Sequence, residues 1–375
     1  MNEDRASRYH RLRRRALYAS TAAGAAWLLT LLASGASARL AAWAFRLFAA
    51  LPTAAGHGLA IAVVVVVVAC GFEAVSLPFE FIRSFVIDRK YGLSSEPLRT
   101  WAGDHLKALA IGLPITVAAA VALYATMRFA GAFWWIASAL LFGAAAVLLS
   151  RLAPVLLMPL FYRFQPLERE ALRERLLTLS RRAGVPVLGV FEWGLGEKTT
   201  RANAALVGIA DTRRIIVSDT LLKDYSDDEI EVILAHELAH HVHYDLWTGL
   251  ALETFAIGVA LWAADFVIAR IGHRWSITRA SDLAGLPLLA LAAGAVSILL
   301  TPLTNAWSRF NERRADTFAL ALTGRPAPFI SAMRRLGAQN LAEERPSKPV
   351  FWFFHTHPTI EERIASARTA PSVSG

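Results

Sequence analysis

The sequence of 375 residues has few charged side chains. Asp, Glu, Lys and Arg make up 18% of it, whereas hydrophobic residues make up 55%. Soluble globular domains carry about 25% charged residues, because water must solvate their surfaces. The shortfall argues against an ordinary soluble enzyme, and the high hydrophobic content excludes a disordered chain. The composition therefore predicts an integral membrane protein.

Cysteine is almost absent, since Cys70 is the only one and lies inside an apolar stretch. One cysteine can form neither an intrachain disulfide nor a thiolate metal cage. Any metal site must therefore use His, Asp or Glu side chains.

Lysine is also scarce, with 5 Lys against 34 Arg in a chain of net charge +9. Six of the arginines fall between Arg5 and Arg15, immediately before an apolar run. Basic residues in that position indicate a cytoplasmic anchor against anionic lipid. We therefore expect the lipid bilayer as a partner, and no nucleic acid.

Six stretches are long enough to cross the hydrocarbon core of a bilayer, which takes about 20 residues. They are Ala16–Ala38, Leu47–Phe72, Ala108–Met127, Phe129–Ser150, Leu246–Ala269 and Leu283–Ser308. The first ends in Ala36-Ser37-Ala38, which a signal peptidase could cleave, although its apolar run is long for a signal peptide. We expect a multi-pass protein with about six transmembrane helices.

The distribution of basic residues predicts the orientation of these helices. Segments 5–15 and 83–99 carry six and four basic residues, whereas the loops expected on the opposite side carry two, one and three. Both termini and the polar segments 163–245 and 309–375 are therefore expected in the cytoplasm.

The spans divide the chain into two predicted domains. Residues 1–162 form a membrane region with four transmembrane helices. Residues 163–375 form a second domain that two further transmembrane helices, at about 246–269 and 283–305, interrupt.

The polar segment after Tyr162 has the pattern of an α+β fold. Leucines at helical spacing predict a helix over 166–183, and short β-rich runs predict strands at 185–191, 201–209 and 213–218. A second helix is expected from Ser226, because Glu229 three residues later completes a capping box.

This second helix carries His236-Glu237-Leu238-Ala239-His240. Histidines at positions i and i+4 share one helical face, so both imidazoles can bind one metal ion. Glu237 between them can accept a proton from a water that the metal activates. A polar helix with incidental histidines is the simpler alternative.

A catalytic zinc ion needs a third protein ligand. Glu312 and Asp316 lie beyond the sixth apolar stretch and are themselves at i and i+4. One carboxylate can bind the metal while the other orients a ligand. On their own, the two residues would indicate only a solvated helix face.

Together these features resemble the M48 family of membrane zinc metalloproteases, and most of all its CAAX prenyl protease (Ste24) branch. The similarity extends over nearly the whole chain. It is carried by five segments: Phe85–Leu93, Asn203-Ala204, Ser226–His241, Glu312–Asp316, and His357-Pro358 followed by Arg363.

The resemblance implies a cytoplasmic α+β zincin-like domain of the gluzincin type and one Zn²⁺ per chain. It implies that His236, His240 and Glu312 bind the ion and that Glu237 is the general base. The other implied roles are a substrate-binding Asn203, a catalytic His357 that stabilises the substrate carbonyl, and a supporting pair, Asp316 and Arg363.

The chain departs from the family pattern in two places. Ala205-Leu206 replaces the aromatic pair that usually follows Asn-Ala. This difference bears on which substrate side chains are preferred, and not on the chemistry of cleavage. Eukaryotic members have seven membrane helices, whereas six spans are evident here.

Several polar residues near the motif have two interpretations. His241 and His243 are expected as exposed helix residues rather than ligands, because neither shares the face of the histidine pair. Asp245 either supports a ligand or ends the amphipathic stretch. Glu253 and Asp265 lie inside a span, where they must face protein or water. They either line the chamber that the resemblance implies or pair between helices.

The leading hypothesis is a zinc endopeptidase of a bacterial inner membrane, acting on peptide or protein substrates, including membrane-associated or lipidated ones. An HtpX-like quality-control protease, an intramembrane site-2-type protease and a metal transporter or channel are the alternatives. Acidic residues at 227–231 start the motif helix in water, which disfavours an intramembrane site. Within the spans, only His57, Glu253 and Asp265 could bind a transported metal.

Overall fold

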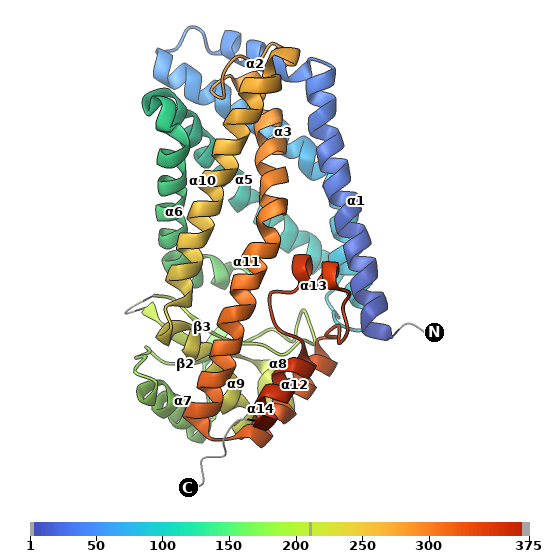
Figure 1. Ribbon diagram of the computed structural model, residues 1–375, viewed down its shortest axis with the longest axis vertical. Coiled ribbons are helices and arrows are strands. Elements are labelled where there is room, and N and C mark those ends of the chain that lie inside the picture. The colour runs from blue at the N-terminus through green and yellow to red at the C-terminus, as the bar shows by residue number, and fades with distance from the viewer. Residues whose placement is uncertain (1–3, 210–211, 370–375) are drawn as a thin grey trace.

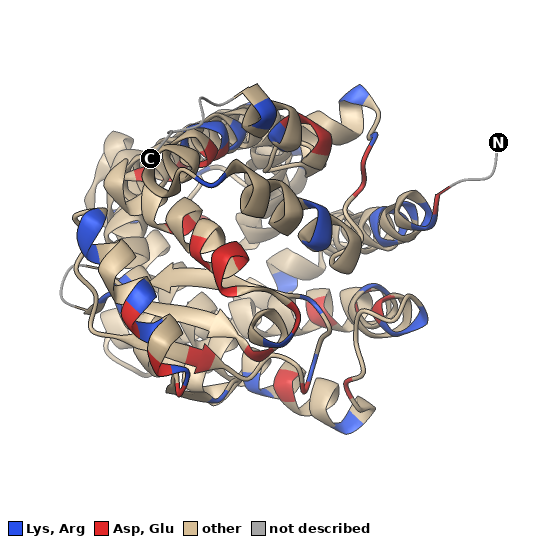
Figure 2. Ribbon diagram, turned by 90° about the horizontal axis from the view of Figure 1, so that it is seen from below, with Lys and Arg blue, Asp and Glu red and all other residues tan. Residues whose placement is uncertain are grey.

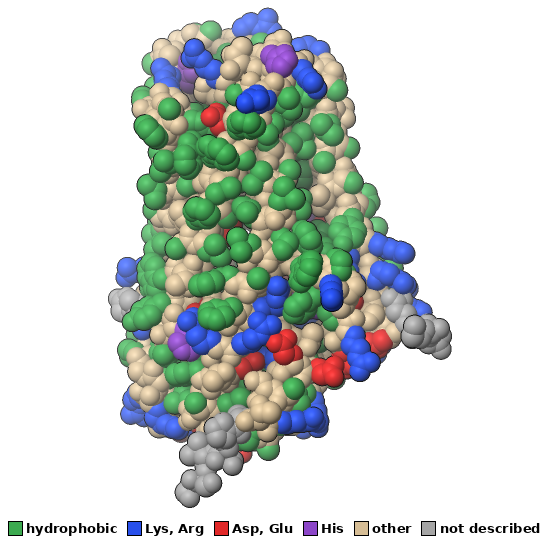
Figure 3. All heavy atoms as spheres, viewed as in Figure 1, with side chains coloured by type: hydrophobic (Ala, Val, Ile, Leu, Met, Phe, Trp, Pro, Cys, Tyr) green, Lys and Arg blue, Asp and Glu red, His purple; other side chains and the backbone are tan. Residues whose placement is uncertain are grey.

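The computed structural model describes residues 4–209 and 212–369. Long helices stand side by side in the upper part of the molecule, and a small α+β domain lies below them (Figure 1). Side chains on the upper part are mainly hydrophobic, while charged side chains gather at its top rim and around the lower part (Figure 3). This arrangement confirms a mostly α-helical polytopic membrane protein with a small sheet.

Among the described residues, six helical stretches are long and apolar enough to cross a membrane, as predicted. They are Arg5–Ala33, Thr53–Lys90, Leu98–Phe129, Gly131–Leu160, Asp245–Trp275 and Leu283–Thr323.

The N-terminal region contains four of these stretches and one short helix. Its elements are α1 (Arg5–Ala33), α2 (Ala36–Leu47), α3 (Thr53–Phe81), η1 (Ile82–Val86), α4 (Ile87–Lys90), α5 (Leu98–Phe129), η2 (Gly131–Phe133), α6 (Trp134–Leu152), η3 (Ala153–Leu157) and η4 (Met158–Leu160). The predicted first span, Ala16–Ala38, is wrong at its end. Gly35 has φ +68° and turns the chain into α2, which is too short to span a bilayer.

The remaining two membrane helices form a hairpin. These are α10 (Asp245–Ile271) and α11 (Leu286–Thr323), joined through η6 (Gly272–Trp275) and η7 (Leu283–Gly285). The helix α11 has 38 residues and runs without interruption from the upper part into the lower domain (Figure 1).

The lower domain contains a four-stranded sheet in the order β1-β2-β4-β3. Its strands are β1 (Phe164–Pro166), β2 (Val190–Trp193), β3 (Ala204–Val207) and β4 (Arg214–Ser218). The strand β4 pairs in parallel with β2 and antiparallel with β3, which leaves β3 at an edge. The sequence predicted three of the strands and missed β1.

The prediction of a strand at 185–191 is wrong at its start. The Val185 N–H donates to the Ser180 carbonyl at 3.0 Å and so closes the preceding helix, α7 (Glu170–Arg182). Pro186 then has no N–H to give to a sheet. The strand therefore begins only at Val190.

The other helices of the domain are α8 (Asp219–Asp224), α9 (Asp227–Val242), α12 (Pro326–Gln339), α13 (Lys348–Phe354) and α14 (Ile360–Thr369). The helix α9 has the predicted capping box, in which Ser226 and Glu229 bond each other's backbone N–H. Its apolar residues Ile230, Leu234 and Leu238 are fully buried in the core of the domain. This core holds α9 firmly beneath the membrane helices.

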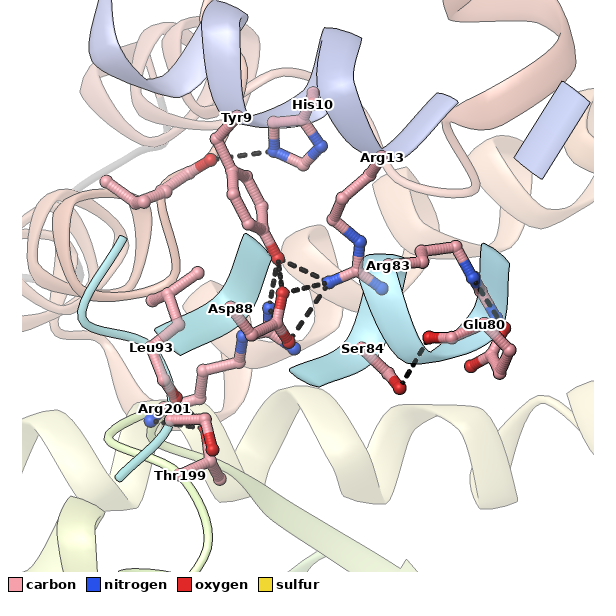
Figure 4. A network of polar contacts seen from close by, with 12 residues as sticks. Tyr9, His10, Arg13, Glu80, Arg83, Ser84, Asp88, Leu93, Thr199 and Arg201 are labelled. Carbon is pink, nitrogen blue, oxygen red and sulfur yellow. Dashed lines mark hydrogen bonds and ion pairs between the residues drawn. The ribbon is translucent and has the colours of Figure 1, made fainter. Parts of the chain in front are cut away.

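A buried polar cluster fastens the lower domain to the N-terminal helix (Figure 4). The Tyr9 hydroxyl donates to Asp88 at 2.7 Å, and Arg13 and Arg201 donate to the same carboxylate at 3.0 and 3.3 Å. Asp88 lies on α4, whereas Arg201 lies just before the edge strand β3. A buried carboxylate paired with two arginines thus joins three distant parts of the chain.

A second buried carboxylate ties α1 to the C-terminal segment. Glu343 accepts hydrogen bonds from Arg14 at 2.6 and 3.2 Å, and His355 lies 3.5 Å away. Burial raises the pKa of Glu343, but His355 and Arg14 outweigh it and lower the pKa to about 2. The helix α1 thus packs against this segment as well as against α3.

We predict that Gly71→Ala lowers the midpoint of thermal unfolding of the detergent-solubilised protein. A Cβ at Gly71 would lie 2.2 Å from the ring of Trp27, which is held by its hydrogen bond to the Val68 carbonyl. Overpacking of this kind costs about 1–3 kcal/mol. Gly112→Ala is the control, because a Cβ there meets no atom within 4 Å. Equal or higher stability of the Gly71 variant would contradict the packing of α1 on α3.

Candidate active site

The helix α9 presents two histidines one turn apart. His236 is buried and His240 is half-buried, and their ring centroids lie 5.0 Å apart. The i, i+4 spacing predicted that both would face the same side of the helix, and the structure confirms it.

Glu312 of α11 lies between these histidines. Its carboxylate oxygens are 3.2 Å from His236 Nε2 and 3.5 Å from His240 Nε2. Glu312 is 5% exposed, so its charge has little contact with water. The lower end of α11 thus meets the histidines of α9, although α10 and most of α11 separate the two segments in sequence.

The far side of each imidazole contacts a further carboxylate. His236 Nδ1 lies 2.9 Å from Asp316 Oδ1, and His240 Nδ1 lies 2.8 Å from Asp245 Oδ2. With Nδ1 donating to these carboxylates, the lone pair of each Nε2 is directed toward Glu312. Carboxylates that accept from the second ring nitrogen are typical partners of metal-binding histidines.

Two arginines hold these outer carboxylates. Arg363 of α14 donates to both oxygens of Asp316, at 2.6 and 2.9 Å. Arg314 donates to Asp245 and, at 3.3 Å, to the side chain of Asn311. Charge-assisted hydrogen bonds of this kind fix the carboxylates and, through them, the imidazole rings.

The arrangement fits a metal ion. His236, His240 and Glu312 offer ligand atoms that all lie within 4.8 Å of one another. A tetrahedral zinc ion with N and O ligands at about 2.1 Å holds its donors about 3.4 Å apart. Glu312 Oε2 is also buried without a hydrogen bond of acceptable geometry, although nitrogens surround it. A cation would bind that oxygen and the Nε2 lone pairs of His236 and His240.

Electrostatics favour the same conclusion. Burial lowers the pKa of His236, but hydrogen bonds with Asp316 and Glu312 outweigh it and raise the pKa to about 9. The surrounding carboxylates therefore stabilise positive charge at this position, whether a proton or a metal ion carries it.

Glu237 lies between the histidines and is half-buried. Burial raises the pKa of its carboxyl group, while positive charge on His236 and His240 opposes the rise. A raised pKa makes the carboxylate a stronger base, which suits the acceptance of a proton.

Two other residues that the sequence selected reach the site from the C-terminal segment. His357 is 60% exposed at its side chain, and its Nδ1 lies 2.7 Å from Glu312 Oε2. Arg363 contacts Asp316 as described and approaches His236 Nδ1 to 3.3 Å. The structure thus gathers seven of the eight selected residues around one point.

Asn203 is the eighth, and it lies at the start of the edge strand β3 with an exposed side chain. Its backbone pairs with Ser218, which donates its N–H to the Asn203 carbonyl at 2.9 Å. Residues bonded to β4 alternate with residues that face away. The N–H and C=O of Ala204 therefore point away from the sheet.

The neighbouring histidines are not ligands but are less exposed than expected. His241 is half-buried, and its Nε2 lies 3.2 Å from the Leu206 carbonyl of β3. His243 is half-buried beside Phe318. Sequence reasoning left Asp245 undecided and missed Arg314, although both lie close to motif residues.

We predict that Asp245→Asn weakens metal binding about 10- to 100-fold, because His240 loses the anionic acceptor that orients it. Competition with a chelator of known affinity measures this. Glu362→Gln is the control, since it removes only an exposed ion pair with Arg313. Unchanged affinity in the Asp245 variant would remove Asp245 from the site.

Comparisons with known proteins support this description. The family profile "Peptidase family M48" matches residues 166–370, and "CAAX prenyl protease N-terminal, five membrane helices" matches residues 2–163. The sequence is 30% identical to the uncharacterized metalloprotease YhfN of Bacillus subtilis over 78% of this chain and 70% of that protein. It is 29% identical to the probable CAAX prenyl protease 1 of Schizosaccharomyces pombe over 77% of this chain, and spans only 62% of that protein.

The fold also has a solved counterpart. The crystal structure of S. mikatae Ste24p matches with a TM-score of 0.83 and 20% sequence identity. The match covers 96% of this chain and 88% of that one. Nearly every element described above therefore has an equivalent there.

Proposed function

The chain belongs to peptidase family M48 and is a CAAX prenyl protease-like metalloendopeptidase; we propose that its metal is one zinc ion held by His236, His240 and Glu312. The resemblance inferred from the sequence motifs is thereby confirmed at the level of the family. The observation that carries the proposal is the carboxylate of Glu312, which lies 3.2 and 3.5 Å from the two Nε2 atoms.

In the proposed mechanism, Glu237 is the general base. A zinc ion in the site would supply a Lewis acid that lowers the pKa of a coordinated water toward ~7. Glu237 accepts a proton from the attacking water and then passes it to the amine that leaves. Its position between the two ligand histidines keeps the carboxylate beside the reacting atoms.

His357 and Arg363 complete the proposed site. His357 is exposed at the mouth of the site and can turn its ring to the substrate carbonyl oxygen, where negative charge develops. Arg363 and Asp316 are positioning residues, because they hold the His236 ring through its Nδ1.

The edge strand β3 is the proposed binding surface for the substrate backbone. The outward N–H and C=O of Ala204 can pair with an extended peptide, as in other complexes formed by strand addition. Asn203 at its start offers a side-chain amide to the same peptide. His241 occupies the Leu206 carbonyl and so ends the free part of the edge.

The proposed substrates are peptides and proteins at or in the membrane, including lipidated ones. The HtpX-like alternative is less well supported, because the CAAX prenyl protease profile matches the N-terminal region. For a metal transporter, ligands would have to lie within the spans. The group found among the described residues lies instead where α11 enters the lower domain.

We further propose that the protein lies in a bacterial inner membrane with its active site and both termini in the cytoplasm. The basic residues of α1 and of the segment after α3 support this orientation. Seen from below, acidic and basic residues are intermixed around the lower end, unlike a continuous basic face for a nucleic acid (Figure 2).

Glu237→Gln should abolish peptide cleavage by the purified protein, by three or more orders of magnitude, while leaving zinc bound. Glu312→Ala is the matched variant and should lose both zinc and activity. Peptide cleavage and metal content are measured on the same samples. Persistent cleavage by the Glu237 variant would show that another group acts as the base.

Reporter fusions test the orientation. Alkaline phosphatase fused after Gly272, in the turn between α10 and α11, is expected to be active, because that turn would face the periplasm. The same enzyme fused after Gly375 is expected to be inactive, whereas a green fluorescent protein there should fluoresce. The reverse pattern would place the active site outside the cytoplasm.

A further inference from the structure

A cavity of about 280 Å³ opens directly beside the metal-binding group. His240 and Glu312 line one end of it, and the rest is formed by the hairpin of α10 and α11. Because two proposed metal ligands belong to its wall, a side chain that occupied this cavity would adjoin the reaction centre.

The wall on α10 is a continuous stripe of one helical face. It consists of Asp245, Gly249, Leu252 and Glu253, at positions i, i+4, i+7 and i+8. A Cβ on Gly249 would meet no atom within 4 Å, so this glycine leaves open space along the stripe. At 1.5 Å per residue, Glu253 lies about 12 Å from Asp245 along the helix.

The residues of α11 that line the cavity also lie along one face of their helix. Thr304, Trp307, Ser308, Asn311 and Glu312 occupy positions i, i+3, i+4, i+7 and i+8. This wall offers hydroxyl groups, one amide and one aromatic ring. The cavity is therefore polar near the metal group, while Leu252 and the ring of Trp307 offer apolar surface to the aliphatic stem of a long side chain.

Glu253 is the charged group at the end of the α10 stripe. No hydrogen bond or ion pair joins it to another of the described residues, and its side chain is exposed. Asp265, farther along the same helix, accepts a hydrogen bond from Trp134 Nε1 at 3.4 Å. A carboxylate inside a membrane helix is costly unless it faces water or a cation. The cavity gives the Glu253 carboxylate access to water, and a bound ligand would give it a cation.

We propose that this cavity binds the side chain of a substrate residue adjoining the cleaved bond, and that Glu253 selects Lys or Arg there. The inference rests on the proposed function, because it takes the metal group as the reaction centre. A cationic head would pair with Glu253, while its aliphatic stem would run along the space that Gly249 leaves. Glu253 is thus a specificity residue, and no role in the chemical step is assigned to it.

Binding is tested first, so that the result does not depend on turnover. The probes are fluorescein-labelled decapeptides of Gly, Ala and Ser with one Lys, Arg, Leu or Glu at each position in turn. The protein is the zinc-loaded full chain carrying Glu237→Gln. We expect Lys and Arg peptides to bind at least tenfold more tightly than Leu peptides at one position. Adding Glu253→Gln should reduce this preference roughly tenfold, since a charge-assisted hydrogen bond is lost.

Matched variants distinguish the effect of the Glu253 charge from a general effect of substitution on the fold. Asp265→Asn should leave the preference unchanged, whereas Glu253→Arg should shift it toward Glu peptides. Gly249→Leu fills the cavity without a backbone clash and should weaken binding of Lys, Arg and Leu peptides while sparing those with Ala at that position. Equal binding of Lys and Leu peptides by the parent, or a preference that survives Glu253→Gln, would overturn the proposal.

Cleavage of the same peptides by the protein with Glu237 intact is measured in parallel. The ratio of kcat/KM between Lys and Leu peptides should follow the binding preference and fall roughly tenfold in Glu253→Gln. A binding preference with no cleavage by the zinc-loaded protein would contradict the proposed function and support the cavity assignment. Cleavage without any preference for Lys or Arg would support the proposed function and contradict the cavity assignment.

Discussion

The contact of the Glu312 carboxylate with His236 and His240 is the constraint on which the arrangement of the chain depends. The histidines belong to a helix of the lower domain, whereas Glu312 belongs to a helix that starts on the far side of the membrane region. The chain must cross and recross that region to bring them together. The hairpin of α10 and α11 is therefore part of the candidate active site as well as part of the membrane region.

Buried charge is balanced locally around this contact. Asp316 and Asp245 each pair with an imidazole on one side and with an arginine on the other. Removing one member of such a buried set leaves its partner uncompensated, which is strongly destabilising. The same principle applies to Asp88 and Glu343, which hold α1 to the segments that carry Asn203 and His357. The N-terminal helix thus helps to position the site although it contributes no ligand.

Much of this organisation was predictable from the sequence, because its signals are local. The capping box at Ser226, the i, i+4 histidines and the six apolar stretches depend only on neighbouring residues. The match of Glu312 to the histidines required a family resemblance, since about seventy residues separate them. Whether Asp245 supports a ligand stayed open, and the role of Arg314 and the cavity beside Glu253 were not predictable. They depend on how α10 and α11 pack, which periodicity alone does not determine.

The unbroken helix α11 fixes the distance between its first turn and the Glu312 carboxylate. From Leu286 to Glu312 the axis measures about 39 Å, whereas the hydrocarbon core of a bilayer is about 30 Å thick. If the helix crosses the core upright from one surface, Glu312 lies about 9 Å beyond the other. Under the proposed function, such a helix would bring the metal-binding group to peptide bonds presented a few residues from the membrane surface.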